Sequence, residues 1–373
     1  MSPDAARAVA RLRPRVAFDV LHLYYLPQFE PVWRELTARG AECVLVLHVG
    51  GEGAAALRAA AARAGVPTRE VVDDRAAAQL YGGGFDWVVF GNEFPLLDAI
   101  PAATRTATLY HGIGIKDCYY DPLLMRTTVR FCEGEWRARE LTRRHPGAPA
   151  RVVSVGFAKL DPLLSAVTAE PRGPALAALS LDPGRRTVLY APTYYPSSIG
   201  CLPHDWPAAV ADLNLIVKLH QFSFSKPRYR DHLALVERWR RFPNVFVAPE
   251  SEYSLLRFMP VADVLVSEAS SAMFEFAALD RPVVWCDFLH LRWQHRGPLR
   301  FRLESRMDPS IQRYADMAAH ARRPADLAGV IRGELAAPGR LSAKRLSYVA
   351  ELVGPLDGHA AARVADELMR PIG

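Results

Sequence analysis

Short apolar runs rich in β-branched residues alternate with amphipathic helical stretches twice along the chain, and this alternation restricts the fold more than any other feature. Apolar runs separated by helices are typical of βαβ units, whose parallel strands form a sheet covered on both faces. The first series predicts strands at Arg15–Leu21, Cys43–His48, Trp87–Phe90, Ala107–Tyr110 and Arg151–Val155. The second predicts strands at Thr187–Tyr190, Leu213–Leu219, Val245–Val247, Val264–Val266 and Pro282–Trp285.

These two series predict an α/β protein with two doubly wound, Rossmann-like domains. The 373 residues suffice for two cores at about 150 residues per domain. The segment Thr168–Pro174 (TAEPRGP) is interpreted as the linker, which gives an N-terminal domain of residues 1–167 and a C-terminal domain of residues 175–373. Strand patterns stop after Asp308, so the second domain is expected to end in helices. Because such sheets bind ligands at the carboxyl ends of their strands, we expect a cleft between the domains, as in GT-B-type glycosyltransferases.

Charge and cysteine content restrict the compartment and the partners. No apolar run approaches the roughly 18 to 20 residues of a membrane span, and the first residues lack the apolar core of a secretory signal. The five cysteines form no CxxC pair or Cys/His cluster, which favours a reduced cytoplasmic chain without structural zinc. The net charge of +6 suits nucleotides, phosphorylated substrates or an anionic membrane surface. Basic runs interleaved with aromatic residues are absent, which argues against nucleic acid as a partner.

The first chemical motif, Tyr110–Lys116 (YHGIGIK), directly follows a predicted strand. It places His111 at the carboxyl edge of the sheet beside Gly112, and glycine lets a backbone approach a ligand closely. An imidazole with an ordinary pKa of about 6.5 accepts a proton from a hydroxyl at neutral pH. The motif therefore predicts a general base, and the alternative is a turn whose histidine caps a helix. Its glycines are too close together for a dinucleotide fingerprint.

The second motif, Leu215–His220 (LIVKLH), is typical of a buried strand that ends in two basic side chains. Alternation along a strand puts Lys218 and His220 on one face near its end. Two such groups can hold a pyrophosphate or stabilise charge on a phosphoryl group in transfer. A solvent-exposed or helix-capping histidine is the alternative interpretation.

The third motif, Asp263–Glu275 (DVLVSEASSAMFE), predicts a strand, a tight polar turn and the start of a helix. Ser270 or Ser271 as the N-cap would present backbone amides to an anion, and an ordinary helix cap is the alternative. Two smaller signals, each alternatively a simple turn, are GFAKLD at the end of the first series and LYAPTY at the start of the second. In the latter, Thr193 offers a hydroxyl beyond a strand that a proline terminates.

Taken in order, these segments resemble the CDP-glycerol glycerophosphotransferase family, which builds teichoic-acid-type polyol phosphate chains. The resemblance runs from about Leu109 to Gly297 through HGxGxK, GxxKxD, LYAPTY, KxH and DVLxSExSSxxFEFAxxxxPV. Asp287 and the later Arg296-Gly297 pair resemble further positions of the family. The chain departs from the family pattern at Glu268 and Glu275, where Asp is usual, and lacks the Pro-Gly-Pro that tends to follow the Arg-Gly pair.

The resemblance implies transfer of a polyol phosphate, glycerol phosphate first, from a CDP-activated donor to an acceptor hydroxyl, with release of CMP. It implies His111 as general base and Lys218 with His220 on the donor phosphates, His220 being counted as catalytic. Arg292, Arg296 or Arg300 is a further candidate for charge neutralisation, and a solvated basic face is the alternative interpretation. The substrate-binding residues that it implies are Gly112, Lys116, Lys159, Asp161, Thr193, Lys218, Glu268, Ser270, Ser271, Glu275, Asp287 and Arg296. Neither the resemblance nor any Asp-x-Asp or Walker-type motif calls for a metal or a cofactor.

The expected acceptor is a glycan, a lipid-linked molecule or a polyol phosphate. The arginine-rich stretch Ala5–Arg15 suggests weak peripheral contact with an anionic membrane, and a frayed terminus is the alternative interpretation. We expect a cytoplasmic enzyme, which works at the inner face of the cell membrane if this contact forms. One alternative function is a GT-B glycosyltransferase or epimerase that uses a nucleotide sugar, with Glu268 or Glu275 holding a sugar hydroxyl. The other is a non-catalytic nucleotide-binding module.

Overall fold

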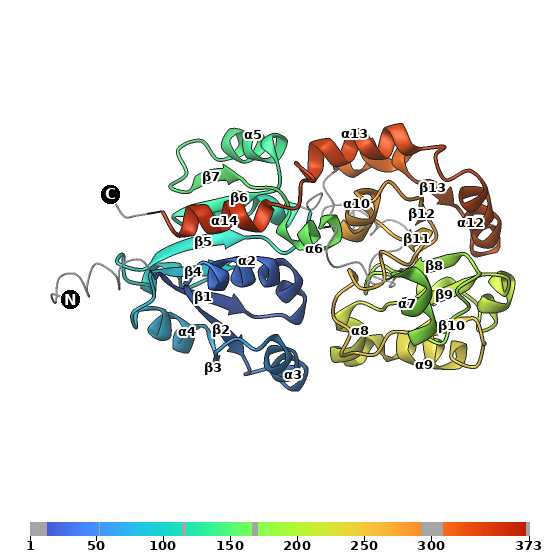
Figure 1. Ribbon diagram of the computed structural model, residues 1–373, viewed down its shortest axis with the longest axis horizontal. Helices are drawn as coiled ribbons and strands as arrows, with labels where there is room; N and C mark the ends of the chain where they lie inside the picture. The colour runs from blue at the N-terminus through green and yellow to red at the C-terminus, as the bar shows by residue number, and fades with distance from the viewer. Residues whose placement is uncertain (1–12, 52, 114–116, 166–170, 292–308, 371–373) are drawn as a thin grey trace. The chain divides into compact units, whose positions relative to one another are not determined.

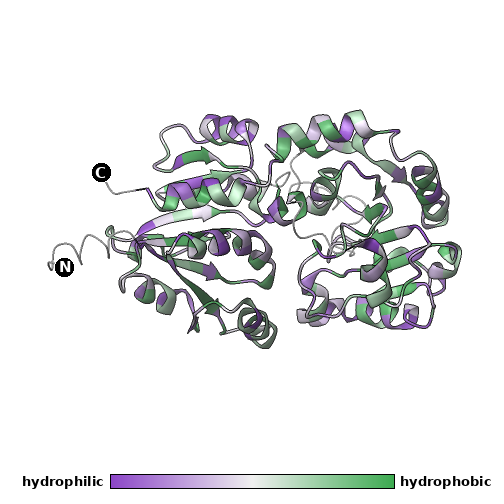
Figure 2. Ribbon diagram, viewed as in Figure 1, coloured by the Kyte–Doolittle hydropathy of each residue, from purple (hydrophilic) through white to green (hydrophobic). Residues whose placement is uncertain are grey.

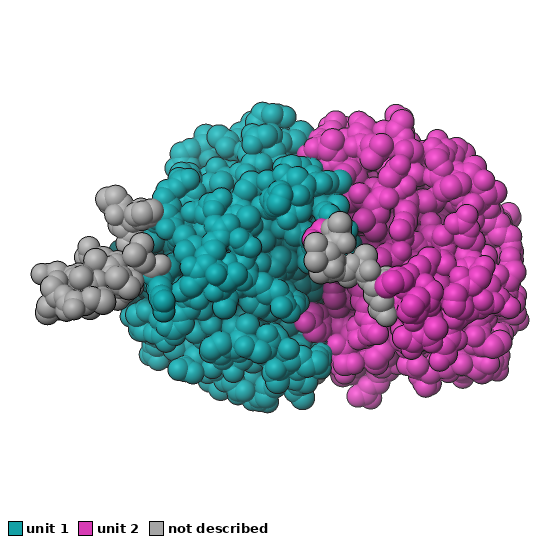
Figure 3. Space-filling view, viewed as in Figure 1, with its two compact units in different colours: residues 1–113, 118–164, 354–373 teal, residues 114–117, 165–353 magenta. Residues whose placement is uncertain are grey.

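The computed structural model describes residues 13–51, 53–113, 117–165, 171–291 and 309–370. The chain forms two compact units, each built on one sheet of parallel strands (Figures 1 and 3). Unit 1 comprises residues 1–113, 118–164 and 354–373, and unit 2 comprises residues 114–117 and 165–353. Helices separate most successive strands of both sheets, so the predicted doubly wound α/β class is confirmed.

Unit 1 contains a seven-stranded sheet of order β3-β2-β1-β4-β5-β6-β7. Its strands are β1 (Arg15–Val20), β2 (Glu42–His48), β3 (Thr68–Val71), β4 (Trp87–Phe90), β5 (Arg105–Leu109), β6 (Val129–Cys132) and β7 (Arg151–Ser154). Its α-helices are α2 (Leu26–Ala38), α3 (Ala54–Ala64), α4 (Asp74–Tyr81), α5 (Glu135–Arg144), α6 (Asp161–Leu164) and α14 (Ala360–Leu368). Its 3-10 helices are η1 (Leu23–Tyr25), η2 (Leu97–Ala99), η3 (Asp117–Tyr120), η4 (Pro122–Met125) and η5 (Ala158–Leu160).

Unit 2 contains a six-stranded sheet of order β10-β9-β8-β11-β12-β13. Its strands are β8 (Thr187–Tyr190), β9 (Asn214–Val217), β10 (Val245–Val247), β11 (Val264–Ser267), β12 (Val283–Cys286) and β13 (Ala319–Ala321). Its α-helices are α7 (Arg172–Ala178), α8 (Gln221–Ser225), α9 (Arg230–Trp239), α10 (Ser271–Ala277), α12 (Leu327–Ala336) and α13 (Ser342–Leu352). Its 3-10 helices are η6 (Ile199–Cys201), η7 (Trp206–Val210), η8 (Pro227–Tyr229), η11 (Pro309–Met317) and η12 (Pro324–Asp326).

The central strands form the core of each unit. Every residue of β4, β8, β9, β11 and β12 is buried, as a sheet covered by helices on both faces requires. Figure 2 shows most of these strands in the green of hydrophobic residues. Each buried Val, Leu or Ile side chain contributes about 1.5–3 kcal/mol relative to its exposed state. No helix among the described residues is long and apolar enough to cross a membrane.

The strand order creates one switch point in each sheet. In unit 1 the chain forms β1, β2 and β3 in one direction and then returns to place β4 on the other side of β1. Unit 2 repeats this pattern with β8, β9 and β10, followed by β11 beside β8. Loops that leave the carboxyl ends of β1 and β4, or of β8 and β11, diverge there, and open parallel sheets bind ligands in such places.

Three strands escape the sequence pattern, each for a physical reason. In β3, three of the four residues are exposed, so no apolar run marks it. In β6, Arg130 interrupts the run although all four residues are buried. The three-residue β13 lies beyond Asp308, so the expectation that strands end there is wrong. The helix α7 begins at Arg172, inside the segment interpreted as linker, while residues 166–170 lie outside the described part.

Residues 354–373 pack with unit 1, whereas the sequence analysis assigned them to the second domain. Gly354, at φ +79°, passes so close to the end of β6 that a Cβ would lie 2.0 Å from the Glu133 carbonyl oxygen. Asp161 then accepts hydrogen bonds from the first amides of α14, those of Ala360 (3.2 Å) and Ala361 (2.7 Å). Both oxygens of this buried carboxylate are engaged, which corrects the predicted substrate-binding role of Asp161 to a structural one.

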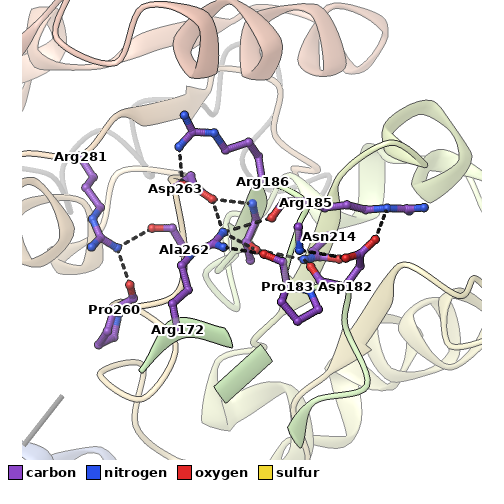
Figure 4. Close-up of polar contacts among 12 residues, drawn as sticks. Arg172, Asp182, Pro183, Arg185, Arg186, Asn214, Pro260, Ala262, Asp263 and Arg281 are labelled. Carbon is purple, nitrogen blue, oxygen red and sulfur yellow. Dashed lines mark hydrogen bonds and ion pairs between the residues drawn. The ribbon is translucent and has the colours of Figure 1, made fainter. Parts of the chain in front are cut away.

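The amino edge of the unit 2 sheet is held by Asp263, the first residue of the third sequence motif (Figure 4). Its carboxylate lies 2.7 Å from a guanidinium nitrogen of Arg172 and 2.7 Å from one of Arg186. It also accepts from the backbone amide of Thr187 at the start of β8. Nearby, Arg281 donates to three backbone carbonyls of residues 259–262. This end of β11 is therefore structural, and ligand chemistry belongs to the opposite end.

A buried polar cluster ties the strands of unit 1 to α4. Asp19 on β1 accepts from Nε2 of His48 (2.7 Å) and from the hydroxyl of Tyr81. Burial disfavours the charged imidazole, but the hydrogen bond and charge of Asp19, together with Asp74 and Asp73, outweigh burial and raise the pKa of His48 above 6.5.

Replacing His48 with Gln should flatten the pH dependence of stability. The folded pKa of His48 lies above its unfolded value, so the ion pair stabilises the fold fully below about pH 6.5 and is lost as pH rises through the folded pKa. We expect the free energy of urea unfolding to fall from pH 6 to pH 9 in the parent chain, and to fall less in His48→Gln. His204→Gln, at an exposed position of unit 2, is the control. Equal slopes in the parent and His48→Gln would contradict the prediction.

Candidate active site

His111 lies two residues beyond β5, at the carboxyl edge of the unit 1 sheet and next to its switch point. Its Nδ1 lies 2.9 Å from the carbonyl oxygen of Gly91, the residue that follows β4. Because a carbonyl oxygen only accepts hydrogen bonds, Nδ1 carries the proton of the neutral ring and Nε2 carries the lone pair. The geometry therefore gives the half-buried imidazole the tautomer that a general base at Nε2 requires.

Aromatic rings fix the plane of this imidazole. Tyr110 and Tyr25 stack nearly parallel to it, at 4.5 and 5.0 Å between ring centroids, and Tyr24 packs at 4.8 Å with a tilt of 59°. Gly91 is required here because a Cβ would lie 2.6 Å from Cδ2 of Tyr25. Sequence reasoning missed Tyr24 and Tyr25, although the run His-Leu-Tyr-Tyr just after the first predicted strand was an available signal.

Lys218 and His220 follow β9 in unit 2, which ends at Val217, whereas the predicted strand extended to Leu219. Lys218 is 7% exposed, and its Nζ donates to the carbonyl of Leu219 at 2.8 Å. His220 is the N-cap of α8, and its Nδ1 accepts from the amide of Phe222 at 3.1 Å. An Nδ1 that accepts leaves the proton of the neutral ring on Nε2, so His220 has the tautomer opposite to that of His111. Its Nε2–H can donate to an anionic oxygen.

Aromatic residues also surround His220. Tyr194, beyond β8, packs on His220 at 4.7 Å and on Phe222 at 5.0 Å. Tyr229 packs on Tyr194 at 5.5 Å and on His232 of α9 at 5.6 Å. Burial lowers the pKa of His232 to about 4, so this ring is neutral at physiological pH. His111 in unit 1 and His220 in unit 2 are thus each oriented by a backbone hydrogen bond and by aromatic packing.

Glu268 does not present its carboxylate to a ligand. It is 2% exposed, and its two oxygens accept from the amides of Thr193 and Ser198, each at 2.6 Å, and from the Ser198 hydroxyl. Burial raises the pKa of Glu268, while these hydrogen bonds act in the opposite sense. The predicted substrate-binding role is therefore corrected: Glu268 joins the loop after β11 to the loop after β8. Thr193 lies in the loop that follows β8, at the carboxyl edge of the sheet, and its hydroxyl donates to the Pro196 carbonyl.

The serines after β11 occupy the predicted turn. Ser270 is the N-cap of α10 in backbone conformation, but its hydroxyl interacts with that of Ser267 at 3.0 Å and does not cap the helix. Ser271 begins the helix and is half-buried. Glu275 is 1% exposed within α10, and its contact with substrate stays a prediction.

The remaining predicted residues divide into three groups. Asp287 follows β12, is exposed, and lies 3.0 Å from Nδ1 of His320, a residue that sequence reasoning missed. Gly112 is buried beside His111, and the half-buried Lys159 donates its backbone amide to the side chain of Gln28. The predicted residues outside the described part of the chain are Lys116, Arg292, Arg296 and Arg300. Within the described part, no three His, Cys, Asp or Glu side chains are grouped to hold a metal ion.

The sequence comparisons agree with the motifs. Residues 135–288 match the family model described as CDP-Glycerol:Poly(glycerophosphate) glycerophosphotransferase. This segment includes Lys218, His220 and Ser270 but not His111. The match confirms the resemblance inferred from the motifs. No curated protein matches the sequence.

Several solved structures share the fold. A variant of the wall teichoic acid polymerase TagF soaked with CDPG matches with a TM-score of 0.65 at 13% identity, over 96% of this chain and 88% of that chain. The S. aureus MnaA–UDP structure matches with a TM-score of 0.60 at 11% identity, over 95% and 96% of the two chains. A UDP-N-acetylglucosamine 2-epimerase matches with a TM-score of 0.57 at 11% identity, over 96% and 95%. These likenesses support the predicted GT-B-type fold.

Replacing Glu268 with Gln tests its structural role. A glutamine oxygen cannot replace both carboxylate oxygens, so one loop amide loses its buried acceptor. We expect the free energy of urea unfolding to fall by about 1–3 kcal/mol. The exposed Glu237→Gln in α9 should change it by less than about 0.5 kcal/mol. A Glu268→Gln variant with parental stability but impaired substrate binding would instead restore the substrate-binding role.

Proposed function

We propose that this chain, a glycerophosphotransferase-type enzyme by its family match, transfers a polyol phosphate from a CDP-activated alcohol to an acceptor hydroxyl and releases CMP. Glycerol phosphate is the first candidate for the transferred group. The observation that carries the proposal is that His111 and His220, each at the carboxyl edge of its own parallel sheet, have opposite tautomers fixed by backbone hydrogen bonds. One ring accepts a proton at Nε2 and the other donates one, which is the pair of groups that phosphoryl transfer between oxygens requires.

His111 activates the acceptor in this mechanism. Its Nε2 takes the proton of the acceptor hydroxyl, while the Gly91 carbonyl stabilises the imidazolium through the Nδ1 proton. The acceptor oxygen then forms a bond to the β-phosphorus of the donor. The bond from that phosphorus to the bridging oxygen breaks, and CMP leaves with the electron pair. A positioned base of this kind is typically worth about 10²–10⁴-fold in rate.

Unit 2 holds the donor in this mechanism. Lys218 neutralises phosphate charge, and Nε2–H of His220 donates to a phosphoryl oxygen, where negative charge develops during transfer. The hydroxyls of Thr193, Ser270 and Ser271 lie at the same sheet edge and supply polar contacts. By the family resemblance, Lys116 and Arg296 add positive charge, and Gly112 lets the backbone approach the substrate. The mechanism needs no metal and no cofactor.

The proposal extends to the acceptor and its place in the cell. The acceptor is a glycan, a lipid-linked molecule or a polyol phosphate used in cell-surface polymer or capsule synthesis. The arginines of Ala5–Arg15 would hold the enzyme at the inner face of the cell membrane, where a lipid-linked acceptor resides.

Thermal unfolding with a panel of nucleotides tests the donor class. We expect CDP-glycerol or CDP-ribitol to stabilise the protein and UDP-sugars to leave its Tm unchanged. A ligand at 100 times its Kd adds about 2.7 kcal/mol, which is readily measured. Mass analysis of the products should then show a phosphodiester and CMP. Stabilisation by UDP-sugars alone would favour the nucleotide-sugar alternative, and CMP binding without turnover of any acceptor would favour a non-catalytic module.

Replacing His111 with Ala separates catalysis from binding. The variant should lose most turnover, about 10²–10⁴-fold in kcat, and bind the CDP-alcohol as tightly as the parent. His111→Gln, which retains an amide donor for the Gly91 carbonyl, should be equally slow because its amide is no base. His204→Ala, at an exposed position, should keep full activity. A His111→Ala enzyme that binds the donor poorly yet turns it over normally would exclude the base assignment.

A further inference from the structure

Two buried arginines share one carboxylate near the end of β5 in unit 1. Arg130 on β6 and Arg137 on α5 are 2% and 1% exposed, and Glu133 between them in sequence is 8% exposed. Glu133 lies 3.6 Å from Nε of Arg137, and Nη1 of Arg137 donates to the hydroxyl of Tyr120. The buried cluster of Arg130, Glu133 and Arg137 therefore carries one more positive charge than negative.

Arg130 holds the uncompensated charge. Among the described residues, its Nε and Nη1 are buried and have no hydrogen-bond partner. Burial lowers the pKa of its guanidinium, and the Glu133 carboxylate acts in the opposite sense. Unsatisfied charged donors in a protein interior cost free energy, so a chain that retains them needs a compensating gain. Positions that break this rule are expected at functional sites.

The position of Arg130 connects it to the candidate base. Arg130 pairs with Thr108 across the β5–β6 ladder, and Tyr110 is two residues further along the same face. The guanidinium carbon lies 5.4 Å from the centroid of the Tyr110 ring, which also contacts the stacked ring of His111 at 4.5 Å and the ring of Tyr119 at 4.6 Å. One tyrosine ring thus contacts both the unpaired cation and the base.

The same tyrosine reaches the surface of the unit. The Tyr110 hydroxyl donates to Sγ of Cys118 at 3.6 Å. All five cysteines are described, and Cys118 alone is exposed. Cys118 therefore offers an exposed thiol in contact with the tyrosine whose ring packs on Arg130.

We propose that Arg130 forms a phosphate-binding site beside His111, and that this site takes the phosphate group that neighbours the reacting hydroxyl of the acceptor. Guanidinium N–H groups that lack partners can donate charge-assisted hydrogen bonds to phosphate oxygens, and the bound anion compensates the buried charge. The assignment to the acceptor rests on the proposed function, in which His111 deprotonates the acceptor hydroxyl. An acceptor that ends in glycerol phosphate has a phosphate close to that hydroxyl.

Binding of small phosphates to the full chain tests the site directly. Inorganic phosphate, glycerol 3-phosphate and glycerophosphoglycerol should each raise the Tm of the parent, and glycerol should not. Comparing the monoesters with the diester distinguishes a free small acceptor from the end of a polymer. Arg130→Met should weaken phosphate binding at least tenfold, and Arg130→Lys should recover part of it. The same phosphate affinity in Arg130→Met and in the parent would overturn the proposal.

Arg105→Met is the matched control, because Arg105 also lies over an aromatic ring, that of Trp87 at 4.2 Å, but at the opposite end of β5. It should bind phosphate as the parent does, and an equal loss in Arg105→Met would overturn the assignment. Without ligand, Arg130→Met should unfold at a Tm no lower than that of the parent, because the substitution removes an uncompensated buried charge. A lower Tm that Arg130→Lys restores, with phosphate affinity unchanged in both variants, would make Arg130 structural and refute the site.

Cys118 provides a readout that needs no variant. Bound phosphate should slow its reaction with a thiol reagent at least threefold in the parent, and glycerol should have no effect. If Arg130→Met does not fold, this measurement in the parent and in Arg130→Lys decides the question. Phosphate that stabilises the protein but leaves the Cys118 rate unchanged lies elsewhere and refutes the site.

Steady-state kinetics assigns the site to the acceptor. Arg130→Met should raise KM for a phosphate-bearing acceptor at least tenfold and leave KM for the CDP-alcohol unchanged. A raised KM for the CDP-alcohol alone would refute the acceptor assignment. If no CDP-alcohol is turned over, the proposed function is wrong. The phosphate site is then still tested by the change in Tm and by the rate of Cys118 modification.

Discussion

Where a parallel strand ends, its ladder of hydrogen bonds stops, and the amides and carbonyls of the following loop need other partners. Side chains at the carboxyl edges of both sheets meet this need. The Gly91 carbonyl receives the imidazole of His111, the Phe222 amide donates to His220, and the loop after β8 donates two amides to Glu268. The backbone group that each side chain satisfies determines what that side chain can still do chemically.

This constraint separates the motif residues by residue type. An imidazole has two nitrogens, so His111 and His220 each bond to the backbone through Nδ1 and keep Nε2 for proton transfer or donation. In a carboxylate whose two oxygens both accept hydrogen bonds from the backbone, neither oxygen is kept for a ligand. Glu268 joins two loops, and Asp161 caps a helix far away in sequence. A glutamate is one methylene longer than the aspartate usual in the resembling motif, which suits its reach to two loops.

The sequence predicts those features that local pattern determines. The apolar runs of β1, β2, β4, β8 and β11 mark buried strands, and motif order places His111, Lys218 and His220 at strand ends. Features that depend on distant partners are not predictable in this way. The return of α14 to unit 1 needs the close passage of Gly354 and the capping carboxylate of Asp161, and neither leaves a local signature. For the same reason, the sequence alone predicts that Glu268 and Asp161 bind substrate, because it does not show the backbone amides that donate to them.

Strand β6 shows the limit of pattern reading most directly. Arg130 interrupts its apolar run, so the sequence analysis missed both the strand and the residue. All four residues of β6 are nevertheless buried, which means that the fold encloses a guanidinium where an apolar side chain would be cheaper in free energy. The arginine that interrupts the apolar run of β6 also places a cation against Tyr110, whose ring stacks on that of His111. A charged residue inside an otherwise apolar run is therefore compatible with a buried strand, and it is a candidate functional residue.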